Sequence, residues 1–184
     1  MTLPASLEGN ERARLFLGLP LPVDAVERLV PWQLQELHDV RIVEPAHLHV
    51  TLAFLGSTPV ARFAEIAEAL TEAARGRERP VLTVSRYRET RSVAMLVLDD
   101  HDARATGLAG DLHARLEGLG VYERERRAWL PHLTVARFRR PPRLKPALPN
   151  LGEVSPSEAA VYLSRLRPGG AQYEILKTVA LGGR

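Results

Sequence analysis

Short runs of alternating apolar and polar residues recur along the chain and predict β-strands, while longer stretches with apolar residues every three or four positions predict helices. The strand-like runs cover residues 12–19, 47–55, 81–87, 93–98, 130–138, 158–166 and 172–181. The helical stretches cover residues 24–39, 60–75 and 102–119. A proline-rich segment at 141–149 predicts a loop.

The first helical stretch contains one unfavourable residue. Pro31 lies in the interior of the helix predicted at 24–39. Proline has no backbone N–H to donate, and its ring clashes with the preceding helical turn. We therefore expect this helix to bend or break at Pro31.

Each half of the chain contains one strand with the pattern His-x-Thr and a long helix of its own. The helix at 60–75 follows that strand in the first half, whereas the helix at 102–119 precedes it in the second. Neither a low-complexity linker nor a break in composition separates the halves. The sequence therefore predicts a single α+β domain over residues 1–184, a bilobal body with two antiparallel sheets lining a central cleft and helices on the outside.

The candidate chemistry is concentrated in the two His-x-Thr strands. The first reads Leu48-His49-Val50-Thr51-Leu52, and the second reads Pro131-His132-Leu133-Thr134-Val135. Random placement would give about 0.06 such motifs with apolar neighbours, so two copies indicate a functional pattern. Because side chains alternate in a strand, each histidine shares a face with its threonine, opposite the apolar residues. Two such strands facing one cleft would bring two imidazoles and two hydroxyls together.

Two histidines and two hydroxyls suit the cleavage of a phosphodiester. A neutral imidazole can take a proton from water, and an imidazolium can give one to the leaving oxygen, since histidine titrates near neutral pH. The hydroxyls of Thr51 and Thr134 would hold phosphate oxygens between His49 and His132. Donor and cationic groups can neutralise the developing charge, so this chemistry requires no metal.

Three further residues are candidates for substrate binding. Arg137 lies five residues after His132 and would suit a phosphate clamp. In a regular strand that offset places it on the opposite face, so it reaches the cleft only through a bulge or a strand end; a surface arginine is the alternative. Phe16 and Tyr173 are candidates for stacking on a base, although Phe16 fits the core equally well.

The absence of cysteine from the sequence narrows the other possibilities. It excludes disulfides, zinc-thiolate sites, iron–sulfur clusters and a cysteine nucleophile. His47 is in phase with His49 and could imitate a metal-binding pair, but no third ligand stands nearby, so no metal or cofactor is expected. His38, His101 and His113 lie in polar surroundings and are expected to be exposed to solvent.

The charge of the chain is compatible with a nucleic-acid or nucleotide substrate. The formal net charge is +3, and Lys145 and Lys177 are the only lysines, so arginine supplies most of the positive charge. The planar guanidinium of arginine suits phosphate. A solvated, arginine-rich surface explains the same composition, so charge alone does not identify a partner.

With these motifs the sequence resembles the two-histidine phosphoesterase superfamily and, within it, the RNA 2′,3′-cyclic phosphodiesterases, also called 2′-5′ RNA ligases. The resemblance is carried by residues 14–22, 48–56, 131–137 and 163–174. It implies a bilobal α+β fold and hydrolysis of a 2′,3′-cyclic phosphate to a 2′-phosphate. His49 would be the general acid and His132 the general base, with Thr51, Thr134 and Arg137 binding phosphate. His47 stands where the family frequently has asparagine, which affects contacts at the rim.

We therefore expect a metal-independent phosphoric diester hydrolase whose partner is RNA with a 2′,3′-cyclic phosphate end or a cyclic nucleotide. Two alternatives remain open: 2′-5′ RNA ligation at the same site, and a module that binds RNA or nucleotide without turnover. The chain starts without a secretory signal and lacks an apolar run of about 20 residues. A monomeric cytoplasmic protein with no membrane association is therefore expected.

Overall fold

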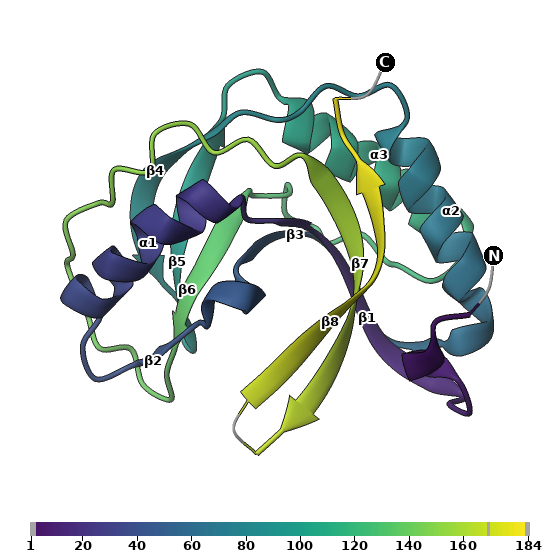
Figure 1. Cartoon of the computed structure of the whole chain (residues 1–184), viewed down its shortest axis with the longest axis horizontal. Coiled ribbons are helices and arrows are strands. Elements are labelled where there is room, and N and C mark those ends of the chain that lie inside the picture. The colour runs from purple at the N-terminus through teal and green to yellow at the C-terminus, as the bar shows by residue number, and fades with distance from the viewer. Residues whose placement is uncertain (1–2, 169, 183–184) are drawn as a thin grey trace.

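Strands arranged in a curved sheet dominate the computed structural model, which describes residues 3–168 and 170–182 (Figure 1). The strands are β1 (Arg12–Pro20), β2 (Arg41–Ile42), β3 (His49–Pro59), β4 (Leu82–Glu89), β5 (Val93–Asp100), β6 (His132–Arg137), β7 (Glu158–Arg167) and β8 (Gly170–Ala180). The helices are α1 (Val23–Glu36), α2 (Phe63–Ala74) and α3 (Arg104–Gly118), with short 3₁₀ turns η1 (Ala5–Leu7), η2 (Pro45–His47) and η3 (Val60–Arg62).

The sheet consists of two antiparallel halves. Its strand order is β4-β5-β6-β3-β1-β7-β8, and β2 pairs with β6 at the side. Within the described residues, the halves are joined through a single β3–β6 residue pair, Val50 with Leu133. The predicted α+β class with outer helices is therefore confirmed, while the two expected sheets are joined into one.

Helices cover the convex side of both halves. Helices α2 and α3 lie together on one side of the molecule, and α1 lies on the other (Figure 1). The core between helices and sheet is built from alternate strand residues; on β1 these are Leu15, Leu17 and Leu19, all fully buried. Burying side chains of this size stabilises the fold by about 1.5–3 kcal/mol each. The opposite face of each strand is left for the concave side.

Two details of the fold differ from the sequence-based expectations. Helix α1 continues through Pro31, so of the expected bend or break the break does not occur. The short strand β2 was not predicted, because two residues are too few for a recognisable alternation. The other strands and the three α-helices lie within a few residues of the predicted ranges. No helix in the described ranges has the length and apolar content needed to cross a membrane.

Candidate active site

The β3–β6 register brings the two His-x-Thr motifs together. Since Val50 pairs with Leu133 in an antiparallel arrangement, His49 lies across from Thr134, and Thr51 lies across from His132. Opposite side chains in such a pair are about 5 Å apart and diagonal ones about 7–8 Å. His49 and His132 are therefore diagonal neighbours, and the charge of His132 acts on the ring of His49.

Both motifs present their polar residues to the concave face. The apolar residues between and after them, among them Val50 and Leu133, are fully buried in the core. The histidines and threonines of both motifs are half-buried instead. His49 and Thr134 line a common pocket. The alternation predicted from the sequence is thus realised in both strands.

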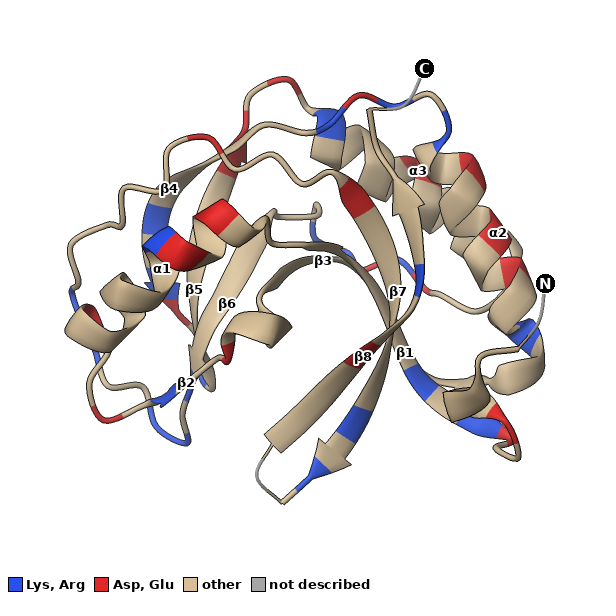
Figure 2. Ribbon diagram, in the orientation of Figure 1, with Lys and Arg blue, Asp and Glu red and all other residues tan. Residues whose placement is uncertain are grey.

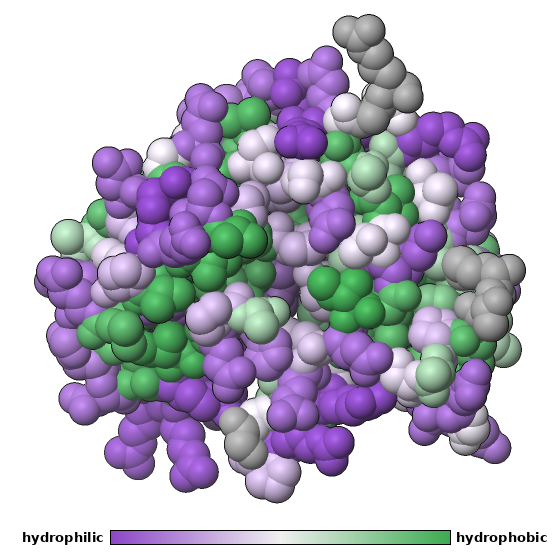
Figure 3. Space-filling model, in the orientation of Figure 1, coloured by the Kyte–Doolittle hydropathy of each residue, from purple (hydrophilic) through white to green (hydrophobic). Residues whose placement is uncertain are grey.

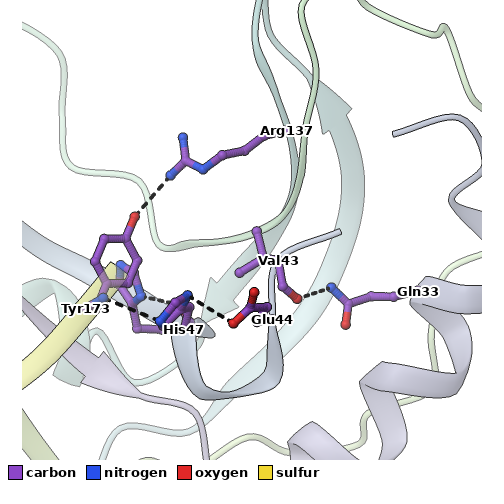
Figure 4. Close-up of polar contacts among 7 residues, drawn as sticks. Gln33, Val43, Glu44, His47, Arg137 and Tyr173 are labelled. Carbon is purple, nitrogen blue, oxygen red and sulfur yellow. Dashed lines mark hydrogen bonds and ion pairs between the residues drawn. The ribbon is translucent and has the colours of Figure 1, made fainter. Parts of the chain in front are cut away.

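A bulge in β6 turns Arg137 toward the same face. Ala136 pairs with Ala94 and Thr134 with Met95, which leaves Val135 as an extra residue. The extra residue shifts the phase of the strand by one. Arg137 consequently lines the same pocket as His49 and Thr134, and its Nη2 donates to the Tyr173 hydroxyl at 3.3 Å (Figure 4).

The two histidine rings are held by the same kind of contact. Nδ1 of His49 donates to the carbonyl oxygen of His47 at 2.7 Å. Nδ1 of His132 donates to the carbonyl oxygen of Leu130 at 2.8 Å. Each bond fixes the proton on Nδ1 in the neutral ring, so Nε2 is the atom that can accept or donate a proton.

The environment of His49 favours its neutral form. Its ring lies 4.7 Å from the ring of Phe16 and 5.4 Å from that of Tyr162. Burial lowers the pKa of His49 to about 4; its bond to the carbonyl of His47 opposes this shift, and the positive charge of Arg137 reinforces it. His49 is therefore uncharged in the free protein at neutral pH.

The structure gives Phe16 and Tyr173 different positions. Phe16 is 3% exposed and stacks on Tyr162 with ring centroids 4.5 Å apart, and the rings of His49 and Tyr173 also contact it. The Phe16 ring is thus packed among the aromatic rings of Tyr162, His49 and Tyr173, with little surface left exposed. Tyr173 is half-buried, lines the pocket beside Arg137 and presents its edge to Phe16.

The other histidines do not join the pair. His47 belongs to η2 rather than β3, and its Nε2 accepts the Tyr173 N–H at 3.4 Å (Figure 4). No group of three or more potential metal ligands occurs among the described residues. The expectation that His113 is exposed is wrong: it is 5% exposed, and its Nε2 donates to the carbonyl oxygen of Leu52 at 2.8 Å.

Sequence reasoning missed two residues that shape the site. Gly18 lies across from Thr51 in β1, and a Cβ there would stand 2.9 Å from the carbonyl oxygen of Val50 and 3.3 Å from Cδ2 of His49. A lone glycine inside a strand signals such a close approach. Arg41 of β2 lies against Gly170 of β8 and lines the pocket mouth; its short strand gave no sequence signal.

This fold and this pair of facing motifs define a two-histidine phosphoesterase. A family model described as the 2′-5′ RNA ligase superfamily matches residues 21–166, and the chain belongs to that superfamily. It is 23% identical over 173 residues to the RNA 2′,3′-cyclic phosphodiesterase of Methanocaldococcus jannaschii, covering 89% of this chain and 98% of that protein.

Solved structures show the same fold. E. coli LigT in its apo form is 26% identical, with a TM-score of 0.75 over 95% of this chain and 100% of LigT. LigT complexed with 3′-AMP has a TM-score of 0.71 at the same identity and coverage. TT0787 of Thermus thermophilus is 27% identical, with a TM-score of 0.78 over 92% of this chain and 98% of that one.

Proposed function

We propose that the protein hydrolyses the 2′,3′-cyclic phosphate at an RNA end to a 2′-phosphomonoester without a metal ion. The observation that supports this proposal is the β3–β6 register, which makes His49 and His132 diagonal neighbours with Nε2 left available on each ring. The relative from Methanocaldococcus jannaschii bears the name of this activity, and LigT has been solved with a bound nucleotide. Because each half of the sheet supplies one motif, the whole chain acts as one catalytic domain.

The proposed reaction uses the two histidines in opposite roles. His132 takes a proton from water, and the water oxygen forms a bond to phosphorus. The bond between phosphorus and the 3′ oxygen breaks, and His49 gives its proton to that oxygen. Thr51 and Thr134 donate hydrogen bonds to nonbridging phosphate oxygens, which fixes the group for in-line attack.

Three other residues support this reaction in the proposal. Arg137 binds a nonbridging oxygen and balances the negative charge that grows in the transition state. Tyr173 lines the pocket beside Arg137 and can contact the nucleoside. Phe16 holds the ring of His49 in place and forms part of the pocket wall.

The low pKa of His49 must be reconciled with its role as the acid. Burial is the main cause of that low pKa, and repulsion from Arg137 adds to it. A bound phosphodiester brings a negative charge beside the ring and offsets the charge of Arg137, which favours the imidazolium. His49 therefore gains its proton as the substrate binds.

The pH dependence of the free enzyme follows from this pKa. We expect kcat/KM to decline as the pH rises above about 4, because the free ring of His49 has then lost the proton that it must give to the 3′ oxygen and has to take one up from solution as the substrate binds. Initial rates at low substrate concentration between about pH 3 and pH 9 would measure this decline. A kcat/KM that stays level from about pH 4 to neutral pH would contradict the assigned role or environment of His49.

Phosphorus NMR gives the direct test of the activity. The protein is incubated with a 2′,3′-cyclic nucleotide and excess chelator, and the product signals are assigned. We expect conversion to the 2′-phosphate at an undiminished rate in chelator. A 3′-phosphate product, or turnover that stops on chelation, would overturn the proposed mechanism. Binding of the nucleotide without turnover would show that the protein is a binding module rather than an enzyme.

Ligation through a 2′-5′ bond is the second candidate, because the chain belongs to a superfamily described by that reaction. In ligation the 5′ hydroxyl of a second RNA takes the place of water: its oxygen forms the bond to phosphorus, and the bond between phosphorus and the 3′ oxygen breaks as in hydrolysis. Hydrolysis should dominate, since water is present at far higher concentration than RNA ends. Supplying a 5′-hydroxyl RNA together with a cyclic-phosphate RNA and measuring product length separates the two activities.

A further inference from the structure

A larger hollow opens from the phosphate site along β1 and β3 toward the tip of the β7–β8 hairpin. It has a volume of about 460 Å³, compared with about 80 Å³ for the pocket around His47 and Arg137. Its volume falls within the usual range for ligand sites, about 300–1,000 Å³. His49 and Thr134 line both spaces, so the two are continuous. We call the larger space the β1–β3 groove.

Positive charge is concentrated along the β1–β3 groove. Arg14, Arg41, Arg137 and Arg167 line it, and no aspartate or glutamate is among the described residues that do so. Figure 2 shows basic residues on β1, near β2 and at the hairpin tip, around the open side of the sheet. Figure 3 shows hydrophilic residues along the same lower edge of the molecule. Arg137 serves the cyclic phosphate in the proposed reaction, and Arg167 at the hairpin can meet a further phosphate of the strand.

An exposed aromatic ring lies on the wall of the same groove. Phe54 is 48% exposed, although it belongs to a strand whose other large apolar residues are mostly buried. An extra residue at Leu52 in β3 puts Phe54 in phase with Thr51 on the concave face. The guanidinium of Arg14 lies over the Phe54 ring, 4.6 Å from its centroid.

An arginine stacked on an exposed aromatic ring suits an unpaired base. Single-stranded RNA is bound through bases that stack on aromatic rings or guanidinium planes, and through cations along the phosphate backbone. Both elements occur here in a groove that begins at the phosphate site. Phe16 is only 3% exposed, so its ring offers too little surface for this platform.

We propose that the β1–β3 groove binds the RNA strand that leads into the terminal nucleotide, with the base of the preceding nucleotide against Arg14 and Phe54. This inference rests on the proposed phosphodiesterase function. A strand that ends in a cyclic phosphate continues only from its 5′ oxygen, so it must leave the phosphate site along an open path. The groove provides that path, and Arg167 at its far end meets a preceding phosphate.

The consequence is a preference for oligonucleotides over cyclic mononucleotides. A mononucleotide fills only the phosphate site, whereas a trinucleotide also gains the stacking and phosphate contacts of the groove. Stacking of one base on such a platform changes affinity by about 5- to 100-fold. We expect the wild-type protein to show kcat/KM for the trinucleotide at least about 10-fold above that for the mononucleotide.

The test compares the two substrates in matched variants. The double variant Arg14→Gln with Phe54→Ala is assayed on a trinucleotide ending in a 2′,3′-cyclic phosphate and on the corresponding cyclic mononucleotide. We expect the ratio of the two kcat/KM values to fall about 10-fold. Arg12→Gln is the control: Arg12 is exposed on the same strand and bonds to Ser57 but does not line the groove. It should leave the ratio unchanged.

Each other outcome has a distinct meaning. A wild-type ratio near one, or an unchanged ratio in the double variant, would overturn the groove assignment while the phosphodiesterase function stands. Loss of ligation alone would show that the groove takes the incoming 5′-hydroxyl strand instead, which also overturns it. If neither substrate is turned over, the proposed function fails. Fluorescence anisotropy with a labelled trinucleotide carrying a 2′-phosphate would then test the groove alone, and equal affinity in wild type and double variant would refute it.

Discussion

Alanine at either His49 or His132 is expected to lower kcat for a 2′,3′-cyclic phosphate by about 10²- to 10⁴-fold, the usual contribution of one positioned acid or base. Each substitution removes one of the two Nε2 atoms that move protons in the proposed reaction. Because the two rings act on one phosphate, the kcat of the double variant should be only slightly below that of the less active single variant. Steady-state kinetics on a cyclic nucleotide would measure these losses.

A control histidine separates chemistry from folding. His101 lies outside the pocket and contacts Thr83 at 3.1 Å, so His101→Ala should keep near wild-type activity. Circular dichroism should show all three variants folded, since His49 and His132 face the concave side rather than the core. Near-full activity of both His49→Ala and His132→Ala would refute the two-histidine mechanism.

A substrate with a better leaving group distinguishes the acid from the base. When sulfur replaces the 3′ oxygen, it departs as a thiolate and no longer needs a proton from the enzyme. His49→Ala should then recover most of its lost rate, whereas His132→Ala should stay impaired because water must still be activated. The opposite pattern would exchange the roles of the two histidines and agree with the neutral state of His49 in the free protein.

Replacing Arg137 with glutamine is expected to reduce kcat/KM by about 10²- to 10³-fold, comparable with the loss of one donor to a developing oxyanion. Glutamine keeps a hydrogen-bonding group but removes the charge and the planar fork. The same assay on Tyr173→Phe isolates the Arg137–Tyr173 bond, whose removal alone should cost far less. Arg139, exposed and outside the pocket, provides the matched control. An Arg137→Gln enzyme within about twofold of wild type would remove Arg137 from the phosphate site.

The sequence predicted the parts of the site that depend on local periodicity. Alternation within each strand placed His49 with Thr51 and His132 with Thr134, and the structure has both arrangements. The need for a bulge before Arg137 was also visible, because an odd offset cannot stay on one face of a regular strand. These inferences required only the alternation of side chains between the two faces of a strand.

What the sequence left undetermined depends on contacts between distant segments. The single β3–β6 pair joins the halves into one sheet, and no pattern within either strand encodes that register. His113 was placed in solvent because its neighbours in sequence are polar, whereas it packs against β3 and bonds to Leu52. The Arg14–Phe54 stack depends on two bulged strands lying side by side, which periodicity alone cannot show.

The narrow junction at Val50 and Leu133 determines what keeps the catalytic groups aligned. A wide ladder of backbone hydrogen bonds would hold two strands rigidly, but here one residue pair joins them. The distance between the imidazoles is therefore governed by how tightly the side chains beneath this junction fit. We therefore expect substitutions that change the volume of the core side chains beneath the junction to alter catalysis, although these side chains do not contact the substrate.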